Sequence, residues 1–328
     1  MLVIIIVTNR QDYTADFLIL ELQKRRADYV RFNTEDFPQH VQVSWQISNA
    51  GLEGYFAFPK TRVDFRDIRS IWYRRPIPPI PSPEIEDPVA REFALDESQA
   101  SLEGIWRSLD CFWVSNPDNL KKAELKLYQL KTASKVGFLL SPTMLTNSPE
   151  VALAFHKDQD EEIVYKPLRR GRLVRDQNVS LIYTNLVSSR EVDKLESVLF
   201  APSLLQRYVA KHLEIRVTII GEKVFAIALH SQEHVESKHD WRRGNRALLR
   251  HEPHLLPVEV ASKCIALVRT LGLAFGAIDL ILTPNGDYVF LEINPNGQWA
   301  WIQQLYPEIP MRETLADLLM SGGLSDNT

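Results

Sequence analysis

The sequence predicts a mixed fold in three parts, an α/β domain followed by two parts of α+β type. The chain opens with an apolar strand, an amphipathic helix and a second strand, the order typical of a βαβ unit on a largely parallel sheet. From Leu204 onward, several strands alternate with one long helix. Its length of 328 residues corresponds to two or three domains at about 100–200 residues per domain. We therefore expect domains at residues 1–115, 116–203 and 204–328.

The first part is expected to combine a sheet, two helices and one extended segment. The run from Arg75 to Pro88 holds six prolines, so it is expected to be extended and free of helix. The next boundary is expected near Ser115-Asn116-Pro117. Strands are expected at Leu2–Val7, Tyr29–Asn33, Val41–Ile47, Tyr55–Phe58, Ser70–Arg74 and Phe112–Val114, and helices at Thr14–Arg26 and Pro88–Leu109.

The two later parts contain more strands than helices. Helical spacing runs from Asn119 to Val136 and stops at Gly137, a residue type suited to the left-handed conformation that ends a helix. A helix is expected at Val258–Leu271, and a short one closes the chain. Strands are expected at Glu162–Lys166, Leu181–Tyr183, Leu204–Val209, Ile215–Ile220, Lys223–Leu229, Phe275–Leu282 and Asp287–Ile293.

Composition excludes several classes of protein. Hydrophobic residues make up 45% and charged residues 24% of the chain, which excludes a disordered or collagen-like chain. No apolar run approaches the ~20 residues that span a bilayer, so no membrane partner is expected. The net charge of −4 gives no reason to expect nucleic acid as a partner. The only two cysteines, Cys111 and Cys264, lack metal-ligand spacing, which favours a reducing cytoplasm.

The most informative segment is an apolar hairpin that carries two acids. Asn285-Gly286 predicts a type I′ turn, because both central positions of that turn need positive φ. Counting back from this turn places Asp279 directly opposite Glu292, whereas a three- or five-residue loop would break that register. Period-two alternation puts Asn294 on the same face as Glu292.

The two acids of this hairpin have two interpretations. Carboxylates that oppose each other across a sheet repel unless a cation lies between them. Together with the amide oxygen of Asn294 they form an oxygen-only set of ligands, which suits Mg²⁺ rather than zinc. The alternative is that both acids point to solvent on the polar face of an ordinary hairpin. The apolar character of both strands favours a cleft over a free surface.

A magnesium site of this kind usually accompanies a nucleotide phosphate. The sequence contains neither a Walker A motif nor Gly-x-Gly-x-x-Gly, so other cations must hold the phosphates. Lys126, in a predicted helix, and Lys166, at the end of a strand before Pro167, are candidates. Either lysine taken alone is also explained as a solvated surface charge.

Taken together, these motifs resemble the ATP-grasp carboxylate–amine ligases. Lys126 in Glu-Leu-Lys-Leu-Tyr-Gln-Leu and Lys166 in Val-Tyr-Lys-Pro are similar to the two ATP lysines of that family. The resemblance covers roughly residues 116–310. It implies adenine recognition by a hinge strand, a nucleotide contact beside it, a cation at the transferred phosphate and a metal site. The residues implied for these roles are Gln206, Tyr208 and Val209 for the hinge, Glu214 for the nucleotide, Arg216 for the phosphate, and Asp279, Glu292 and Asn294 for the metal.

Motifs in the first third of the chain narrow this resemblance. They are similar to the branch that makes microviridins and related graspetides by closing side-chain lactones or lactams on a ribosomal precursor peptide. One segment departs from the family, because the glycine-rich loop expected after Lys166 holds a single glycine and three arginines. The similar motifs are the opening Val-Thr-Asn, Phe32-Asn-Thr-Glu-Asp-Phe-Pro and Ile71-Trp-Tyr-Arg74-Arg75-Pro76.

The resemblance implies a three-part ATP-grasp fold that clasps ATP between the central and C-terminal domains. The implied enzyme activates Asp or Glu side chains of the precursor peptide as acyl phosphates, which Ser, Thr or Lys then captures as esters or amides. Its implied cofactors are ATP and two Mg²⁺ ions. Its implied partners are a precursor peptide with a leader segment and a second copy of the chain in a homodimer. The alternatives are a ligase for a free amino acid or small metabolite and an inactive nucleotide-binding regulatory protein.

A charged loop near residue 240 supplies a further candidate. Asp-Trp-Arg242 resembles the family's Asp-aromatic-Arg element, which implies that Arg242 contacts phosphate or a substrate carboxylate. The alternative is a solvated loop. His230, His234 and His239 in the same loop offer ligand types for zinc, but lack the neighbouring residues typical of a zinc site.

Two charged groups are candidates for binding the peptide. Arg74 and Arg75 either bind a peptide carboxylate or pair with Glu92 or Glu97 to fix the proline-rich segment. A short helix is expected at Val192–Phe200, where an acidic face is either solvated or, by resemblance, the dock for a basic residue of the leader. The acids of that face are Glu191, Asp193 and Glu196.

Overall fold

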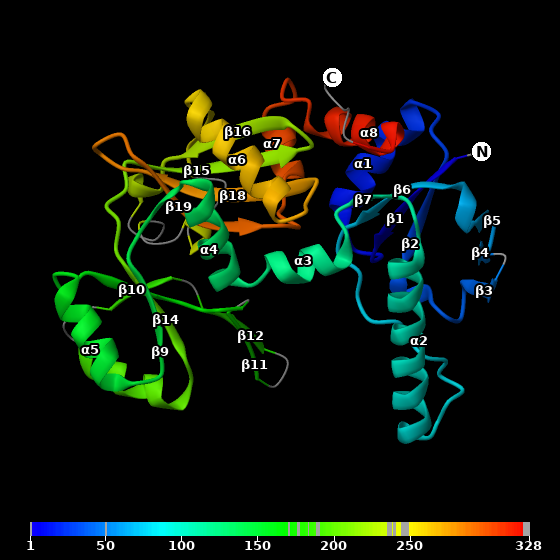
Figure 1. Cartoon of the computed structure of the whole chain (residues 1–328), viewed down its shortest axis with the longest axis horizontal. Helices are drawn as coiled ribbons and strands as arrows, with labels where there is room; N and C mark the ends of the chain where they lie inside the picture. Colours follow the sequence, from blue (N-terminus) through cyan, green and yellow to red (C-terminus); the bar gives the residue numbers. More distant parts are fainter. Residues whose placement is uncertain are drawn as a thin grey trace.

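The computed structural model describes most of the chain as a mixed α/β protein (Figure 1). The described residues are 2–49, 51–169, 171–175, 178–182, 184–187, 191–234, 238, 241–243 and 249–323, with the backbone alone for 172–175, 178–181 and 242. Their strands form a parallel sheet near the N-terminus, a small antiparallel sheet beside it, a central sheet, a two-stranded ribbon and a C-terminal sheet. The predicted mixture of α/β and α+β architecture is confirmed.

The N-terminal sheet has the order β2-β1-β6-β7 and is parallel throughout. Its middle strand β1 is almost completely buried, as expected for a parallel strand covered on both faces. A separate antiparallel sheet has the order β3-β4-β5. The elements of this part are β1 (Val3–Thr8), α1 (Tyr13–Lys24), β2 (Tyr29–Asn33), β3 (Gln42–Ser48), β4 (Gly51–Phe58), β5 (Thr61–Asp64), β6 (Ile68–Tyr73), α2 (Pro88–Ser108) and β7 (Phe112–Val114).

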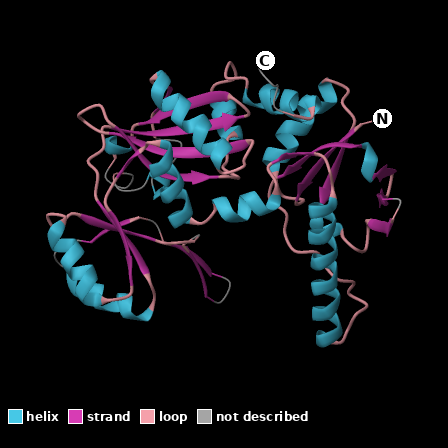
Figure 2. Cartoon of the chain, in the orientation of Figure 1, coloured by secondary structure: helices cyan, strands magenta, loops and turns pink. Residues whose placement is uncertain are grey.

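Local signals set the helix starts in this part. Asp12 accepts a hydrogen bond from the Thr14 backbone at the start of α1. Asp87 caps α2 in the same way, and Pro88 occupies the first turn, where its missing N–H costs nothing. The proline-rich segment before α2 contains neither helix nor strand and runs as a loop beside that helix (Figure 2).

The central sheet is antiparallel, with the order β13-β10-β14-β9. Helix α5 packs with the 3₁₀ helix η3, and Figure 1 shows the sheet and these helices as a unit set apart from the other sheets. The elements are β9 (Thr143–Thr146), α5 (Pro149–Asp158), β10 (Ile163–Lys166), β13 (Asn185–Val187), η3 (Val192–Phe200) and β14 (Ser203–Arg207), with the ribbon β11 (Arg172–Arg175) and β12 (Asn178–Leu181) beside them.

The C-terminal sheet has the order β17-β16-β15-β18-β19-β8. Its central strand β15 is buried along its whole length. The strands are β8 (Leu139–Leu140), β15 (Leu213–Ile220), β16 (Lys223–Leu229), β17 (His251–Pro253), β18 (Phe275–Leu282) and β19 (Tyr288–Asn294). The helices of this part are α3 (Pro117–Ala123), α4 (Lys126–Val136), α6 (Val258–Thr270), α7 (Ala300–Leu305) and α8 (Met311–Ser321), with the 3₁₀ turns η4 (Ser231–Glu233) and η5 (Trp241–Arg243).

Two predicted elements are wrong in detail. The single helix expected from Asn119 to Val136 is two helices, because the chain leaves helical geometry between α3 and α4 at Leu125. Gly137 does end α4, with φ of 90°. The strand expected at Leu181–Tyr183 is instead β12, which ends at Leu181, and Tyr183 lies outside the described residues. The domain boundaries stay a prediction.

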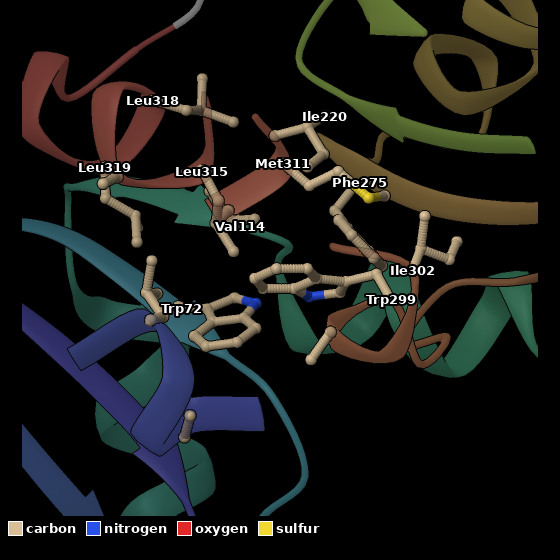
Figure 3. Packing of buried hydrophobic residues seen from close by; sticks show 14 of the residues in the cluster. Trp72, Val114, Ile220, Phe275, Trp299, Ile302, Met311, Leu315, Leu318 and Leu319 are labelled. Carbon is tan, nitrogen blue, oxygen red and sulfur yellow. The ribbon is translucent and has the colours of Figure 1, made fainter. Parts of the chain in front are cut away.

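The N-terminal part and the C-terminal sheet share one hydrophobic core. Trp72 of β6 and Trp299, which precedes α7, both lie in it, and Figure 3 shows their indole rings beside each other below Leu315 of α8. The central sheet has its own smaller core around Phe155. Among the described residues, the helices are too short or too polar for a membrane span.

Candidate functional site

A cleft of about 1400 Å³ lies where strands of the central and C-terminal sheets approach each other. Its walls come from β10 and β14 on one side and from α4, β15, β18 and β19 on the other. Most of the predicted site residues line it. They are Lys126, Lys166, Gln206, Tyr208, Val209, Glu214, Arg216, Asp279, Glu292 and Asn294, together with Arg75.

The hairpin of β18 and β19 brings the two acids together. Asp279 lies directly opposite Glu292, so the predicted register is confirmed. The pairing between this point and the turn, however, differs from the predicted one. Leu282 pairs with Tyr288, one residue out of the predicted register, and an extra residue at Leu291 restores it before Glu292. The β-bulge therefore decides which residue of β19 opposes Asp279.

The predicted type I′ turn is wrong. Of the two central residues only Gly286 has positive φ, at 90°. Gly286 donates its N–H to the Thr283 carbonyl, and the Thr283 N–H reaches the Asp287 carbonyl. This is a three-residue loop with a glycine in the left-handed position. Pro284, whose ring fixes φ near −65°, suits the first position of this loop, where the only residue with positive φ is Gly286.

Each acid of the hairpin is paired with its own cation. Arg216, directly opposite Asp279 on β15, places Nη1 2.9 Å from both carboxylate oxygens. Lys126 forms an ion pair with Glu292. Asn294 donates from Nδ2 to Asp279 at 3.1 Å and to Glu292 at 3.4 Å. The expected repulsion is thus relieved by protein cations, and the side chains of both acids are less than a fifth exposed.

Helix α4 carries Lys126 to this position. Because the chain breaks at Leu125, Lys126 is the first residue of α4. Gln129, one turn later and only 4% exposed, fixes the helix to β19. Its amide donates to the Ile293 carbonyl at 2.9 Å and accepts from the Ile293 N–H at 3.2 Å, and it also donates to the Ala123 carbonyl at 2.6 Å. Gln129 stands in the motif that marks Lys126, but the sequence reasoning gave it no role.

The opposite wall is formed by the central sheet. Lys166 donates from Nζ to Gln206 Oε1 at 2.6 Å, and Gln206 donates to the Thr143 hydroxyl at 2.8 Å. Lys166 ends β10, so this hydrogen bond joins the second predicted ATP lysine to the predicted hinge strand β14 beside it. Burial, followed by the charges of Glu162 and Glu214, raises the pKa of Tyr208.

A third ion pair in the cleft was not predicted. Lys211 lies 2.8 Å from Glu214, and both side chains are less than a tenth exposed. The available signal was the i,i+3 spacing of a lysine and an acid just before β15. Buried ions are expected to be paired, so the burial of Glu214 calls for such a partner.

The two predicted arginines of the first part have different surroundings. Arg74 is fully buried, which leaves no guanidinium surface for a peptide carboxylate, and it contacts Asp12, Asn296 and Gln298 rather than Glu92 or Glu97. Arg75 lines the cleft and donates to the Asn296 carbonyl at 3.0 Å.

The remaining candidates lie away from the hairpin or outside the described residues. The side chain of Arg242 and the whole of His239 are outside them. His230 contacts Glu252 at 2.9 Å and Glu233 at 3.4 Å. The acidic face lies on the central part, away from the cleft lining, with Glu191 3.3 Å from Lys194. Asp193 and Glu196 of that face are exposed.

The chemistry of the hairpin fits a divalent cation. Two carboxylates and the side-chain amide of Asn294 converge on one face at the edge of a cleft. The amide here donates from Nδ2 to both acids, and its oxygen would complete with the carboxylates the oxygen donor set that hard cations prefer. In the present arrangement Lys126 and Arg216 neutralise the charges of the two acids. A bound cation could take over this neutralisation from the two side chains. Within the described part of the chain, no cluster of three His, Cys, Asp or Glu side chains is arranged to hold a metal.

The chain is similar to solved ligases over nearly its whole length. An ATP-grasp ligase from Chryseobacterium gregarium is associated with ribosomally synthesised, modified peptides and was solved with ADP and a leader and core peptide. It has a TM-score of 0.91 and 28% identity, covering 98% of this chain and 97% of that chain. The macrocyclase MdnC from Microcystis aeruginosa MRC, bound to its precursor peptide MdnA, has a TM-score of 0.84 and 28% identity, covering 98% and 100%.

Two further findings concern the sequence. The macrocyclase MdnB from the same organism is 30% identical, with a TM-score of 0.79, and the alignment covers 98% of this chain and 100% of that chain. The family model of the MvdD pre-ATP grasp domain matches residues 3–121. No curated protein matches the sequence.

Proposed function

This chain belongs to the ATP-grasp ligases of the microviridin type, and we propose that it closes rings in a ribosomal precursor peptide. It uses ATP to activate an Asp or Glu side chain of the peptide as an acyl phosphate. A Ser or Thr hydroxyl, or a Lys amine, of the same peptide then forms the ester or amide. The observation that carries the proposal is the convergence of Lys126, Arg216 and the acids Asp279 and Glu292 in one cleft between two sheets.

The chemistry consists of two displacements. A carboxylate oxygen of the peptide attacks the γ-phosphorus of ATP, the bond to the β–γ bridging oxygen breaks, and ADP leaves. The hydroxyl or amine then attacks the acyl carbon, inorganic phosphate leaves, and the nucleophile's proton passes to solvent. Because charge accumulates on the phosphoryl oxygens, the chain's contribution is positioning and neutralisation rather than covalent catalysis.

The residues of the cleft divide this work. Lys126 and Lys166, on opposite walls, hold the phosphates as point charges, and Arg216 faces the transferred phosphoryl group with two donors. The hinge residues Gln206, Tyr208 and Val209 bind adenine. Glu214, held by Lys211, lies beside the nucleotide. Arg242 adds a further cation toward the phosphate or the peptide carboxylate.

Asp279, Glu292 and Asn294 would hold Mg²⁺, which would neutralise charge on the nucleotide phosphates, and we propose two ions for the complete site. Binding of ATP and cation requires Lys126 and Arg216 to exchange the acids for phosphate oxygens. The chain's own ion pairs therefore preserve the charge balance of the cleft before the substrates arrive. The two free cysteines suit a reducing compartment, so we place the enzyme in the cytoplasm. We also propose that it acts as a homodimer.

The experiment that tests this function combines the purified chain, ATP and Mg²⁺ with a precursor peptide encoded beside its gene. We expect ADP formation that depends on the peptide and a peptide mass lower by one water for each ring. Mass spectrometry after mild base distinguishes esters, which hydrolyse, from amides, which do not. ADP formation with free amino acids but without any peptide would point instead to a small-molecule ligase. No ADP under either condition would favour a nucleotide-binding regulatory protein.

We also propose that the leader segment docks on the acidic face of η3, apart from the cleft. That face carries Glu191, Asp193 and Glu196, and it is followed by two exposed apolar side chains, Leu199 and Phe200. A leader with a basic residue beside apolar ones would match both features. Recognition there would let the core peptide move while the leader stays bound.

Reversing the three acids of this face to lysine tests the docking surface. We expect the leader alone, without ATP, to bind at least ~10-fold more weakly to the triple variant, because three attractive charges become repulsive. ATP affinity should not change. The matched control reverses three exposed acids of α2, Glu92, Asp96 and Glu97, which lie on another domain. Equal leader affinity in both triple variants would exclude this face.

A further inference from the structure

Arg74 is a charged residue whose side chain has no exposed surface. It follows β6 directly, and its guanidinium points away from the N-terminal sheet toward residues near the end of the chain. Nη1 donates to the Asn296 carbonyl, and Nη2 donates to Gln298 Oε1 at 2.9 Å. Nε lies 3.6 Å from the carboxylate of Asp12. The forked side chain thus joins the first domain to residues that follow β19.

Such burial is costly for an arginine. Desolvation, followed by the nearby charge of Arg75, lowers the pKa of Arg74 to about 9, so that it still carries its charge at neutral pH. A buried charge needs both a counterion and hydrogen-bond acceptors. Asp12 supplies the charge and is itself fixed, since it accepts from the Thr8 hydroxyl at 2.8 Å and from the Thr14 N–H at 3.1 Å.

The acceptors of Arg74 belong to one short loop, which we call the 295–298 loop. It begins directly after Asn294 and ends before Trp299. The Asn296 carbonyl accepts from Arg75 as well as from Arg74. The Gln298 side chain accepts from the Thr14 hydroxyl at 2.7 Å. The first domain therefore holds this loop through three side chains, those of Thr14, Arg74 and Arg75.

The 295–298 loop packs directly against Arg216. Gly297 is so close that a Cβ added to it would lie 2.7 Å from Arg216 Nη2 and 2.3 Å from the Ala277 Cβ. Only a glycine fits there without moving the guanidinium. The loop is also tied to Asn294, whose carbonyl accepts from the Gly297 N–H at 3.0 Å. A shift of the loop would therefore displace both Arg216 and Asn294.

From these contacts we infer that Arg74 is a positioning residue, through which the first domain holds the 295–298 loop and thereby sets the place of Arg216 and Asn294 in the cleft. The inference rests on the proposed function in assigning Arg216 and Asn294 to the reaction. Trp72 and Trp299 support it, because they flank the two ends of this connection and lie together in the shared core (Figure 3).

The first test needs no substrate. Hydrogen–deuterium exchange of the ligand-free protein should show several-fold faster exchange in peptides covering residues 294–299 of Arg74→Met than of the wild type. The matched control is Arg25→Met, which removes a different ion-pairing arginine of the same domain, the one that contacts Glu21 and Asp317. It should leave those peptides unchanged. If Arg74→Met does not fold, Arg74→Lys, which keeps the charge and loses the fork, is judged by the same criterion. Unchanged exchange of residues 294–299 would overturn the inference.

The second test is a double-mutant cycle with Arg216→Lys. In the wild-type background, Arg74→Met should lower kcat by about 10–100-fold at saturating ATP and peptide, because small displacements of a catalytic group have large effects on rate. The KM for ATP should not change, since the two lysines and the hinge lie elsewhere in the cleft. In the Arg216→Lys background the same substitution should have little further effect.

Two results distinguish a failure of this inference from a failure of the proposed function. If the two substitutions multiply fully, Arg74 does not act through Arg216 and the inference is wrong. If the wild-type protein turns over neither ATP nor peptide, the proposed function fails, while the exchange measurement still decides whether Arg74 holds the loop.

Discussion

At the level of single residues, the site is organised by pairs of opposite charge. Asp279 and Glu292 oppose each other, yet each has its own partner, Arg216 for the first and Lys126 for the second. The sequence predicts a cation between the acids and favours Mg²⁺ in that place. Protein cations relieve the repulsion in the ligand-free arrangement, so removing one acid should not stabilise the fold.

Glu292→Gln separates a metal-binding role from a structural one. We expect turnover to fall by at least ~10²-fold, because the charge facing the phosphates is lost. The free energy of unfolding should fall by only about 1 kcal/mol, since the amide oxygen still accepts from Lys126. ADP release and urea unfolding measure the two quantities. Asp287→Asn, an exposed acid in the turn of the same hairpin, is the control and should change neither. Normal turnover in Glu292→Gln would remove Glu292 from the metal site.

The two lysines of the cleft should both contribute to nucleotide affinity. Lys126→Ala and Lys166→Ala are each expected to weaken ATP binding by about 10-fold or more, because a hydrogen bond to a charged group contributes ~1.5–3 kcal/mol. Calorimetry with Mg-ATP measures this directly. Lys131→Ala, on an exposed position of α4, is the matched control. A lysine whose loss leaves ATP affinity unchanged does not contact the phosphates.

Sequence reasoning identified the residues of the cleft that are expected to bind phosphate and metal, but not the residues that hold them in position. Lys126, Arg216 and the acids were identified because their types and order match a motif. Gln129 and Lys211 were missed, since each acts by contacts with residues distant in the chain or just beyond a motif. The role of Arg74 could not be read from its neighbours, because its partners near Asn296 are more than 200 residues away.

At the level of elements, α4 and the β18–β19 hairpin must be fixed relative to each other for Lys126 to reach Glu292. Hairpin register could be predicted only in part. The prediction placed Asp279 opposite Glu292 through a two-residue turn, whereas a three-residue loop and a bulge at Leu291 together give the same pairing. The loop is one residue longer than predicted, and the bulge adds one residue to β19, so the two shifts of register cancel. The pattern of alternation fixes which face the acids occupy, but it carries no signal for where a bulge lies.

Gln129 is the contact that joins α4 to β19, and Gln129→Leu tests it. We expect the free energy of unfolding to fall by about 2–4 kcal/mol, because buried backbone groups of Ala123 and Ile293 lose their partner. ATP affinity should fall as well, since Lys126 lies one turn away. Thr132→Val on the same helix is the control. Its hydroxyl bonds only within the helix, to the Tyr128 carbonyl, so its loss should cost less than ~1 kcal/mol. Stability loss without any change in ATP affinity would show that Gln129 does not position Lys126.

At the level of the whole molecule, the described residues form four hydrophobic clusters, of which three belong to the N-terminal and C-terminal sheets and one to the central sheet. The packing therefore falls into two bodies, one with three clusters and one with a single cluster. One core joins the N-terminal sheet, the C-terminal sheet and α8, which lies against α1 in Figure 1. Ser70 of β6 donates to the Leu319 carbonyl of α8 at 2.8 Å, so the end of the chain closes onto its beginning. The central sheet packs around its own cluster with η3. Because the cleft lies between these two bodies, the nucleotide would bridge them.

This division predicts which strands are destabilised by a substitution in each of the two cores. Leu315→Ala, in the shared core, and Leu195→Ala, in the central cluster, are matched substitutions of buried leucines, and each is expected to cost about 2–5 kcal/mol. Hydrogen exchange of the intact protein in mild urea should show faster exchange in both β1 and β15 for Leu315→Ala, with β10 unchanged. Leu195→Ala should give the reverse pattern, with faster exchange in β10 and β14 alone. If Leu315→Ala affected β15 but not β1, the N-terminal and C-terminal sheets would be independent in stability, and a first domain that loosens alone could not hold Arg216 through the 295–298 loop.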